Sequence, residues 1–435
     1  MDFEQAAGHA ADLVQSLSPG ARVRVVSHSD ADGIAAAAVM AVTLTRAGFR
    51  HHISIRHTGS SIAAGITDDY SLAVFCDIGS GNLDELNGLP CQAILVDHHV
   101  IDGSLDNGIN LNVRSYDMDG SREACGATAT LALSLAVSPD NLDLAELAVA
   151  GAIGDRQHVG GYQGLNRMLL DRAIEADVIS MEEQPVFPPD VPLMDALEQS
   201  IDPYFTGFHG GGAIRFLKEH GRDPMQPYAD LSPAERKKLL SALALKLLEQ
   251  QAAEISLTYT TPTGSHYGSL ADLTSKMNAC ARSGQPGVGI AMCLGSSSAR
   301  EEAKKLQQGY RDSIRREMRA LEDEEPIRHS HLTAFHIKDA SLKGVAAGLS
   351  MEYLPQFPPD RPVIALSRQD SHVDISSRGT RRLVDQGLDL AAGLQQAAES
   401  VGGSGGGHPV AAGASIPGGK ETDFLETLNE VLSQQ

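Results

Sequence analysis

Short apolar or β-branched runs alternate with longer helical patterns over the first third of the chain. Three runs have the length and composition of buried strands, and they lie at 21–27, 71–77 and 91–97. Three longer segments rich in Ala and Leu have the character of helices, and they lie at 33–48, 124–137 and 142–155. This alternation predicts a parallel α/β sheet with helices on both faces.

The pattern changes near residue 185. A Pro-rich stretch at 184–197 indicates a boundary. The segment 231–251 then has a helical pattern that begins at Ser-Pro. The segment 298–325 is helical too, and it is so rich in Glu, Lys and Arg that we expect an exposed connecting helix.

Strand-like runs return after Pro326, at 331–339 and 361–369, and a terminal helix is expected at 424–434. The fold class predicted for the whole chain is therefore α/β. We expect an N-terminal parallel-sheet domain at 1–185, a mostly helical middle insertion at 186–325, and a smaller C-terminal α/β domain at 326–435.

Composition refines this picture. Hydrophobic residues make up 42% of the 435 positions, aromatic residues only 4%, and Trp is absent, so the core must consist mainly of aliphatic side chains. The formal net charge is -21, which is not the profile of a non-specific duplex-DNA binder. A local basic groove can still exist on an acidic chain, so nucleic acid stays open as a partner.

The cysteine pattern and the N-terminus bear on the compartment. The chain has five cysteines and no CxxC spacing, which argues against a disulfide framework and against a structural zinc site. The first residues lack a basic segment followed by an apolar run, and no stretch approaches the ~20 apolar residues of a membrane span. We therefore expect a cytoplasmic protein with reduced thiols and no membrane partner.

Candidate chemistry begins in the segment SHSDADG. His28, Asp30 and Asp32 follow one another at every second position. If the preceding strand continues, all three side chains project to one face. Carboxylates held so close together are unfavourable unless a cation lies among them, so the spacing indicates a metal site.

Further Asp and His residues follow the other predicted strands. Asp77 ends the run at 71–77, and Asp97, His98 and His99 stand together after the next run. Asp155 follows a helical segment, so its position is argued less directly. Open parallel sheets place their sites at the carboxyl edge. Asp and His suit Mn²⁺ or Mg²⁺, and two such ions ~3.5–4 Å apart would clamp a phosphate and activate water.

Each segment alone has an ordinary structural explanation. Asp is common in loops after strands, paired His residues often lie on surfaces, and the Gly-rich stretch at 401–417 has the composition of a linker. All four acidic segments in this order, three of them at strand ends, are much harder to explain by structure alone.

The order HxDxDG, an isolated Asp, DHH and GxxGD resembles that of the DHH phosphoesterases. The distal SSRG at 376–379 and GGGH at 405–408 resemble the DHH-associated domain of the same family. Within the family the chain is most similar to the RecJ-like branch, especially the archaeal RecJ-like nucleases. The segment 273–295 also resembles a stretch of those proteins.

The resemblance implies two divalent metal ions, with Mn²⁺ preferred and Mg²⁺ possible. One ion would be held by His28 and Asp30, and Asp77 would bridge both ions. The second ion would be completed by Asp32, His98 and Asp155.

The resemblance also implies substrate contacts. His99 would lie beside the scissile phosphate, orienting it or acting as a general acid. Arg378 would bind a phosphate, and Gly405, Gly406 and Gly407 would let the backbone approach the ligand closely. His408 would contact the nucleotide.

The function implied first is a two-metal phosphodiesterase, namely an exonuclease on single-stranded DNA or RNA, and the long insertion could guide a strand. One alternative is a phosphodiesterase of short oligonucleotides or cyclic dinucleotides. Another is a replisome-associated scaffold with replication proteins as partners, although every implied metal ligand is present.

Overall fold

The computed structural model describes residues 2–57, 60–101, 103–252 and 255–435. The chain divides into two compact units. The first comprises Met1–Glu183 and Thr260–Tyr310, and the second comprises Gln184–Tyr259 and Arg311–Gln435. Each unit is described by itself below.

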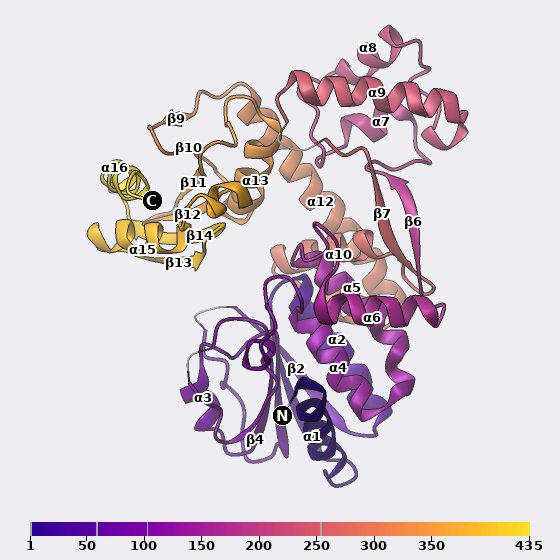
Figure 1. Ribbon diagram of the computed structural model, residues 1–435, viewed down its shortest axis with the longest axis vertical. Coiled ribbons are helices and arrows are strands. Elements are labelled where there is room, and N and C mark those ends of the chain that lie inside the picture. The colour runs from indigo at the N-terminus through magenta and orange to yellow at the C-terminus, as the bar shows by residue number, and fades with distance from the viewer. Residues whose placement is uncertain (1, 58–59, 102, 253–254) are drawn as a thin grey trace. The chain divides into compact units, whose positions relative to one another are not determined.

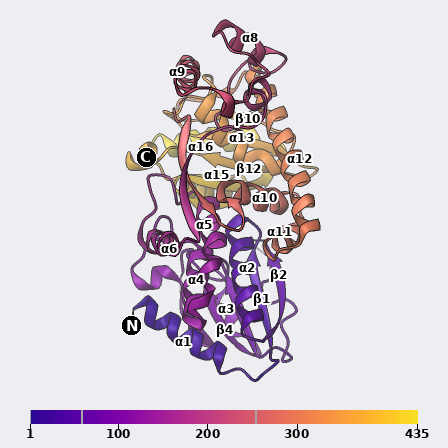
Figure 2. The same ribbon diagram turned by 90° about the vertical axis from the view of Figure 1, so that its right-hand side faces the viewer.

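The first unit is built on a five-stranded sheet in the order β2-β1-β3-β4-β5, and every neighbouring pair is parallel. Figures 1 and 2 show this sheet in the indigo and purple part of the chain. The strands are β1 (Arg22–His28), β2 (Arg50–Arg56), β3 (Leu72–Cys76), β4 (Gln92–Val96) and β5 (Gly108–Asn110). The predicted strands at 21–27, 71–77 and 91–97 are thereby confirmed. The prediction did not include β2, because Ile53 and Ile55 are the only apolar residues of its sequence RHHISIR.

Helices cover the two faces of this sheet unequally. One face shares a large Ala- and Leu-rich core with most of the helices of the unit (Figure 1). These helices are α1 (Phe3–Gln15), α2 (Ala31–Arg46), α4 (Gly126–Val137), α5 (Ala145–Gly154), α6 (Gly164–Glu175), α10 (Leu270–Arg282) and α11 (Pro286–Cys293). The other face packs against the short α3 (Leu83–Asn87) and against Ile62, Ile66 and Tyr70 of a connecting segment.

The remaining elements of this part of the chain are short, apart from one long helix. A small sheet has the order β6-β7-β8, with β6 at Ile179–Pro185, β7 at Thr258–Gly264 and β8 at Gly268–Ser269. Turns of 3-10 helix occur at Val113–Tyr116 and Pro139–Leu144. The predicted charged helix is α12 (Ser297–Glu322), and its second half belongs to the second unit.

The second unit contains a six-stranded sheet in the order β13-β14-β12-β11-β10-β9. Only β10 and β11 pair in parallel. The strands are β9 (Ile327–Arg328), β10 (Thr333–His336), β11 (Val363–Arg368), β12 (His372–Arg378), β13 (Ser404–His408) and β14 (Ala411–Pro417). The Gly-rich stretch is thus a β-hairpin and not a linker, because β13 pairs along its whole length with β14.

Helices of the second unit fall into two sets. Near the C-terminal sheet are α13 (Lys343–Tyr353), α14 (Arg381–Asp385), α15 (Leu390–Ser400) and α16 (Glu421–Leu432), with a 3-10 turn at Ala340–Leu342. The other set is α7 (Leu193–Glu198), α8 (Gly212–Glu219) and α9 (Pro233–Glu249), with a 3-10 turn at Tyr228–Asp230. None of the helices among the described residues is both long and apolar enough to cross a membrane.

Buried polar contacts join these two sets. The side chain of Gln250, at the end of α9, donates to the carbonyl oxygens of Tyr204 at 2.7 Å and of Tyr353, at the end of α13, at 3.2 Å. The hydroxyl of Tyr353 donates to Asp202 at 2.5 Å. These hydrogen bonds therefore connect the helices α7–α9 with the part of the chain that forms the C-terminal sheet. The predicted boundaries at 185 and 325 stay a prediction.

Candidate metal centre

Acidic and imidazole side chains gather at the carboxyl edge of the parallel sheet. β1 ends at His28, β3 is followed by Asp77, and β4 is followed by Asp97, His98 and His99. Three groups could each hold a cation, since their ligand atoms lie within 4.8 Å of one another. The groups are His28 with Asp30 and Asp77; Asp32 with His98 and Asp155; and Asp77 with Asp97, His98 and His99.

The prediction that His28, Asp30 and Asp32 project to one face of a continued strand is wrong. The strand stops at His28, so the three residues do not alternate along an extended chain. Asp30 instead caps α2 by accepting a hydrogen bond from the backbone N–H of Gly33 at 2.9 Å, and Asp32 lies within the first turn of that helix. The tight turn places the two carboxylates in different groups, one beside His28 and the other beside His98.

Gly33 is required for this turn. A Cβ atom at this position would lie 2.3 Å from the carbonyl oxygen of His28, so the first turn of α2 could not approach the end of β1. The hydroxyl of Ser27 closes the same turn by donating to the carbonyl oxygens of Gly33 at 2.7 Å and of Cys76 at 2.8 Å. β1, α2 and β3 are thereby joined directly beneath the acidic residues.

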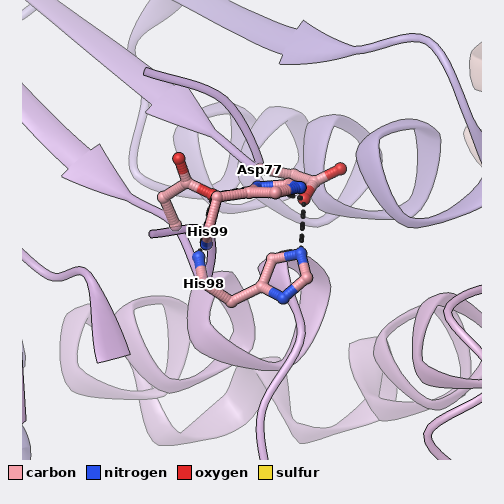
Figure 3. Close-up of side chains that lie close together, drawn as sticks. Asp77, His98 and His99 are labelled. Atoms are coloured by element: carbon pink, nitrogen blue, oxygen red, sulfur yellow. Dashed lines mark hydrogen bonds and ion pairs between the residues drawn. The ribbon is translucent and has the colours of Figure 1, made fainter. Parts of the chain in front are cut away.

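Asp77 is the central residue of the cluster. Its side chain is buried, and its backbone has a φ of 59°, which a non-glycine residue seldom adopts. One carboxylate oxygen lies 3.1 Å from His98 Nε2, the contact drawn in Figure 3, and the other lies 3.7 Å from His28 Nδ1. That second oxygen, Oδ2, is buried and has no hydrogen-bond partner among the described residues. A buried carboxylate oxygen without a donor fits a cation ligand.

The electrostatics of the cluster also fit a cation. Burial and then the neighbouring Asp32 and Asp30 raise the pKa of Asp77 well above its usual value. Burial and then Asp32 raise the pKa of Asp155 to about 8. Without a cation, burial and the mutual repulsion of the carboxylates thus favour the protonated forms of Asp77 and Asp155.

Asp30 behaves differently. Burial would raise its pKa, but the hydrogen bond from His28 Nδ1 at 2.7 Å and the backbone N–H of Gly33 bring its pKa below the usual value. Asp32 accepts backbone N–H groups of Gly126 at 2.6 Å and Ala127 at 3.0 Å, at the start of α4. Helix starts therefore position both carboxylates of the DxD segment.

His98 is held in one orientation. Its Nδ1 donates to the carbonyl oxygen of Gly120 at 2.5 Å, because only a protonated nitrogen can bond that oxygen. Its Nε2 is therefore the nitrogen that faces Asp77 and Asp155, the latter at 3.3 Å. This arrangement matches a metal-ligating imidazole whose other nitrogen bonds a backbone carbonyl.

Asp97 orients His99 and is no free ligand. Its Oδ1 accepts hydrogen bonds from the backbone N–H of His98 at 2.8 Å and from Nδ1 of His99 at 2.8 Å, and its Oδ2 accepts from the hydroxyl of Ser80 at 2.6 Å. Burial would raise the pKa of Asp97, but these donors bring its pKa below the usual value. The side chain of His99 is 40% exposed, so its Nε2 remains available to a substrate.

Gln157 was missed by the sequence analysis. Its side-chain N–H group donates to the carbonyl oxygens of Gly120 and Ala124, each at 3.1 Å, and its own oxygen accepts from Asn166 at 2.6 Å. Gln157 thus supports the same carbonyl oxygen that holds His98. The one feature of the sequence that could have indicated Gln157 is its position two residues after Asp155.

Replacing Gln157 with Leu is expected to weaken Mn²⁺ binding about 10-fold to 100-fold, because the Gly120 carbonyl that orients His98 loses its second donor. Calorimetric titration of the metal-stripped protein with MnCl₂ measures this affinity. Gln15→Leu is a suitable control, because Gln15 lies on α1 and donates only to the carbonyl oxygen of Val137. Equal affinities for the Gln157 variant and the wild type would contradict a role in orienting His98.

Metal binding is expected to strengthen as pH rises from about 6 to 8. In this range Asp155, with its pKa of about 8, still holds a proton that the cation must displace. His98 adds to the effect, since burial lowers its pKa but the surrounding carboxylates raise it above the usual value. Affinity should rise up to tenfold per pH unit for each displaced proton and level off above pH 8.

Calorimetry of MnCl₂ binding in buffers of different ionisation enthalpy counts the protons released. Release of less than about half a proton at pH 6.5 would show that these carboxyl groups are already ionised without a cation.

Apart from His99, the residues implied as substrate contacts lie in the second unit. Arg378 ends β12, and its guanidinium donates to the carbonyl oxygen of Ser377 at 2.8 Å and to the hydroxyl of Ser376 at 3.3 Å. In the sheet, Arg378 and His408 are both in register with Ala411 of β14, so they occupy one row at the same end. The structure therefore brings Arg378 and His408 together.

The three glycines of the hairpin differ in what surrounds them. A Cβ at Gly405 would lie 2.9 Å from the carbonyl oxygen of Leu394 on α15, and one at Gly407 would lie 2.7 Å from Cα of Ala412. Packing within the unit is thus sufficient to explain these two positions. A Cβ at Gly406 would meet nothing within 4 Å, so Gly406 is the glycine whose open space fits the approach of a ligand.

Two family models match the chain. The model of the DHH family, N-terminal domain, matches residues 22–153, which contain β1 to β5. The DHHA1 domain model matches residues 345–434, which contain β11 to β14. The chain is also 29% identical over 438 residues to an uncharacterized protein of Methanocaldococcus jannaschii, with 95% of this chain and 94% of that protein covered.

Similar folds occur among solved structures. RecJ of Thermus thermophilus in complex with Mn²⁺ matches with a TM-score of 0.60 and 17% identity, over 100% of this chain and 55% of that one. This chain thus spans about half the length of that RecJ. The same RecJ is known in complex with Mg²⁺. Cdc45 of Entamoeba histolytica matches with a TM-score of 0.68 and 11% identity, over 99% of this chain and 98% of that one. The chain therefore belongs to the DHH family, with an N-terminal DHH domain, a DHHA1 domain and a RecJ-like fold.

Proposed function

We propose that the protein is a metal-dependent phosphodiesterase that acts as an exonuclease on single-stranded nucleic acid. The observation that carries the proposal is Asp77, a buried carboxylate with one oxygen facing His98, the other facing His28, and no hydrogen-bond donor on its Oδ2. A buried carboxylate oxygen without a hydrogen-bond partner, among four other buried or half-buried Asp residues, is unfavourable for folding unless a cation is bound. Membership of the DHH family supports the same chemistry.

Two divalent cations fit the donor set, and Mn²⁺ or Mg²⁺ suits a site made of carboxylates and imidazoles without thiolates. His28, Asp30 and Asp77 would hold one, while Asp32, His98 and Asp155, with Asp77 shared, would hold the other. When bound, they lower the pKa of water and neutralise the charge that develops on a phosphate under attack.

The chain's own residues supply the remaining steps. His99 is fixed through its Nδ1 by Asp97 and its side chain is 40% exposed, so its Nε2 can donate a hydrogen bond or a proton to the leaving oxygen. The carbonyl of Gly120 keeps His98 in the tautomer that leaves Nε2 free of a proton. In the DHHA1 domain, Arg378 and His408 present cationic and hydrogen-bonding groups suited to a phosphate and a nucleotide.

Matched single-stranded DNA and RNA, labelled at one end, test the proposal directly. The protein is stripped with EDTA and assayed with Mn²⁺ or Mg²⁺, with wild type beside Asp155→Asn. Progressive shortening by the wild type alone is expected, and the labelled end gives the polarity. Cleavage of dinucleotides or cyclic dinucleotides but of neither long strand would replace the exonuclease with the alternative phosphodiesterase.

Activity on none of these substrates would shift the proposal to a scaffold for replication proteins. Capture of such partners by the inactive Asp155→Asn variant as well as by wild type would support that role, because it would then not depend on catalysis.

A further inference from the structure

The edge strand of the N-terminal sheet carries a row of basic side chains. β2 is the outermost strand, and its register with β1 pairs Arg50 with Arg22 and His52 with Arg24 (Figure 2). Because side chains in register share a face of a parallel sheet, these four residues lie on one face. Arg56 continues the row at the carboxyl end of β2. We call these five residues the β2 basic face.

This face stands out on a strongly acidic protein. Asp and Glu account for 56 of the 435 residues and the formal net charge is -21, yet β1 and β2 contain no acidic residue. Arg22 has an ion pair with Asp69 at 3.5 Å, but the two side chains are 51% and 70% exposed. Such an exposed pair contributes little, so a phosphate can replace the Asp69 carboxylate at low cost.

Arg24 gives the face a buried positive charge. It is only 5% exposed, and its guanidinium donates to neutral groups: Nδ1 of His52 at 2.6 Å, the hydroxyl of Tyr70 at 3.2 Å and the hydroxyl of Ser54 at 2.5 Å. Its Nε has no partner, and no carboxylate forms an ion pair with it in the part of the chain that the structure describes. Buried arginines are normally paired with acids, so the unpaired charge of Arg24 adds to the positive potential of this face.

The same contact fixes His52. Arginine has only donors, so Nδ1 of His52 must accept the hydrogen bond, and the ring proton is left on Nε2. Burial and then Arg24 and Arg22 lower the pKa of His52, which is exposed at the strand edge. The edge strand thus presents an N–H donor beside the guanidinium groups.

One end of the β2 basic face lies beside the candidate metal centre. Arg56 is in register with His28, which ends β1 within the acidic cluster. At ~3.3 Å per residue, the six steps from Arg50 to Arg56 span roughly 20 Å. Ile53 and Ile55 of β2 pack into the core that contains α2, so the basic side chains lie on the opposite face of the sheet.

We propose that the β2 basic face binds the phosphate backbone of a single strand beyond the nucleotide held at the metal centre. The inference rests on the proposed function and deepens it, because a track of this length favours a long strand over a dinucleotide as substrate. Contacts to phosphates alone carry no base information, so binding along the face is independent of sequence and sensitive to salt.

The test uses the full chain, stripped of metal, and a fluorescent 20-nucleotide strand of single-stranded DNA. The variant is Arg22→Glu with Arg50→Glu, and the matched control is Lys237→Glu with Lys238→Glu on α9, where both lysines lie on the outer part of the helix. Each Lys or Arg to Glu change lowers the charge by two, so both double variants shift from -21 to -25. The Arg22/Arg50 variant should bind the strand at least about tenfold more weakly than wild type at low salt. A plot of log affinity against log salt should also be shallower by about 1.4, because each of the two lost phosphate contacts contributes ~0.7 to its slope.

The control should bind within about twofold of wild type. Equal losses of affinity in both double variants would overturn the proposal, because net charge alone would then explain the losses. Wild-type affinity in the Arg22/Arg50 variant would overturn it too. Cleavage of a dinucleotide with Mn²⁺ separates the two proposals. The Arg22/Arg50 variant should cleave it at the wild-type rate, and a loss of this activity would also overturn the track. A wild type that binds the long strand through these residues but cleaves no substrate would overturn the proposed function alone.

Discussion

Replacing Asp77 with Asn is expected to abolish cleavage and to raise the thermal stability of the metal-free protein. Asn tolerates the left-handed backbone of this position and keeps the shape of the side chain. It removes a carboxyl group whose pKa is raised well above its usual value by burial and then by Asp32 and Asp30, so the repulsion within the cluster decreases. It also removes the carboxylate that we propose the two cations share, so we expect cleavage to fall by at least about 10³-fold.

Melting curves with EDTA and with excess MnCl₂ provide the measurement. The variant should melt at least about 3 °C above the wild type in EDTA and gain little from Mn²⁺, while the wild type gains clearly. Asp177→Asn is the control, because Asp177 has a φ of 56° and is exposed. A lower melting temperature for the Asp77 variant in EDTA would mean that its carboxylate stabilises the metal-free fold.

His99→Gln is expected to reduce kcat by about 10²-fold to 10⁴-fold and to leave the affinity for Mn²⁺ unchanged. His99 is bonded through Nδ1 to Asp97, and its ring lies 4.3 Å from that of His98, between centroids. Its side chain is partly exposed, which fits a proton donor to the leaving oxygen. The neighbouring His98→Gln should instead lose Mn²⁺ binding, because Nε2 of His98 faces Asp77 and Asp155.

A substrate with a better leaving group distinguishes a proton donor from a residue that only orients the phosphate. A nitrophenyl phosphodiester needs little protonation of its leaving oxygen, so the His99 variant should recover most of its activity on it. If the defect is as large on this ester as on DNA, His99 positions the phosphate and does not protonate the leaving group. Loss of Mn²⁺ binding by the His99 variant would make it a ligand.

The sequence predicts β3 and β4 well because strongly apolar runs there end directly before the candidate metal ligands. The runs before Asp77 and Asp97 are largely apolar, so strand ends could be placed to within a residue. The grouping of Asp30 with Asp32 failed because capping of α2 ended the extended chain earlier than assumed. β2 was missed because its basic side chains obscure the apolar alternation of Ile53 and Ile55.

Other features depend on contacts that no local pattern reports. Gln157 supports Gly120 from 37 positions away, and Glu146 on α5 accepts from the backbone N–H groups of His266 at 2.9 Å and Tyr267 at 2.9 Å. The membership of Thr260–Tyr310 in the first unit rests on such distant contacts too. A single sequence gives spacing along the chain but not which buried polar groups satisfy one another.

The discontinuous first unit determines how a catalytic fragment must be made. A recombinant fragment that stops at residue 185 would lack α10 and α11, whose Met277, Cys280 and Ile290 belong to the same core as α2 and α5. It would leave that apolar surface and the carboxylate of Glu146 exposed, so we expect an aggregating product. Because β6 and β7 are neighbours in one sheet, a short turn joining 183 to 260, with the chain ended near 310, keeps the core whole.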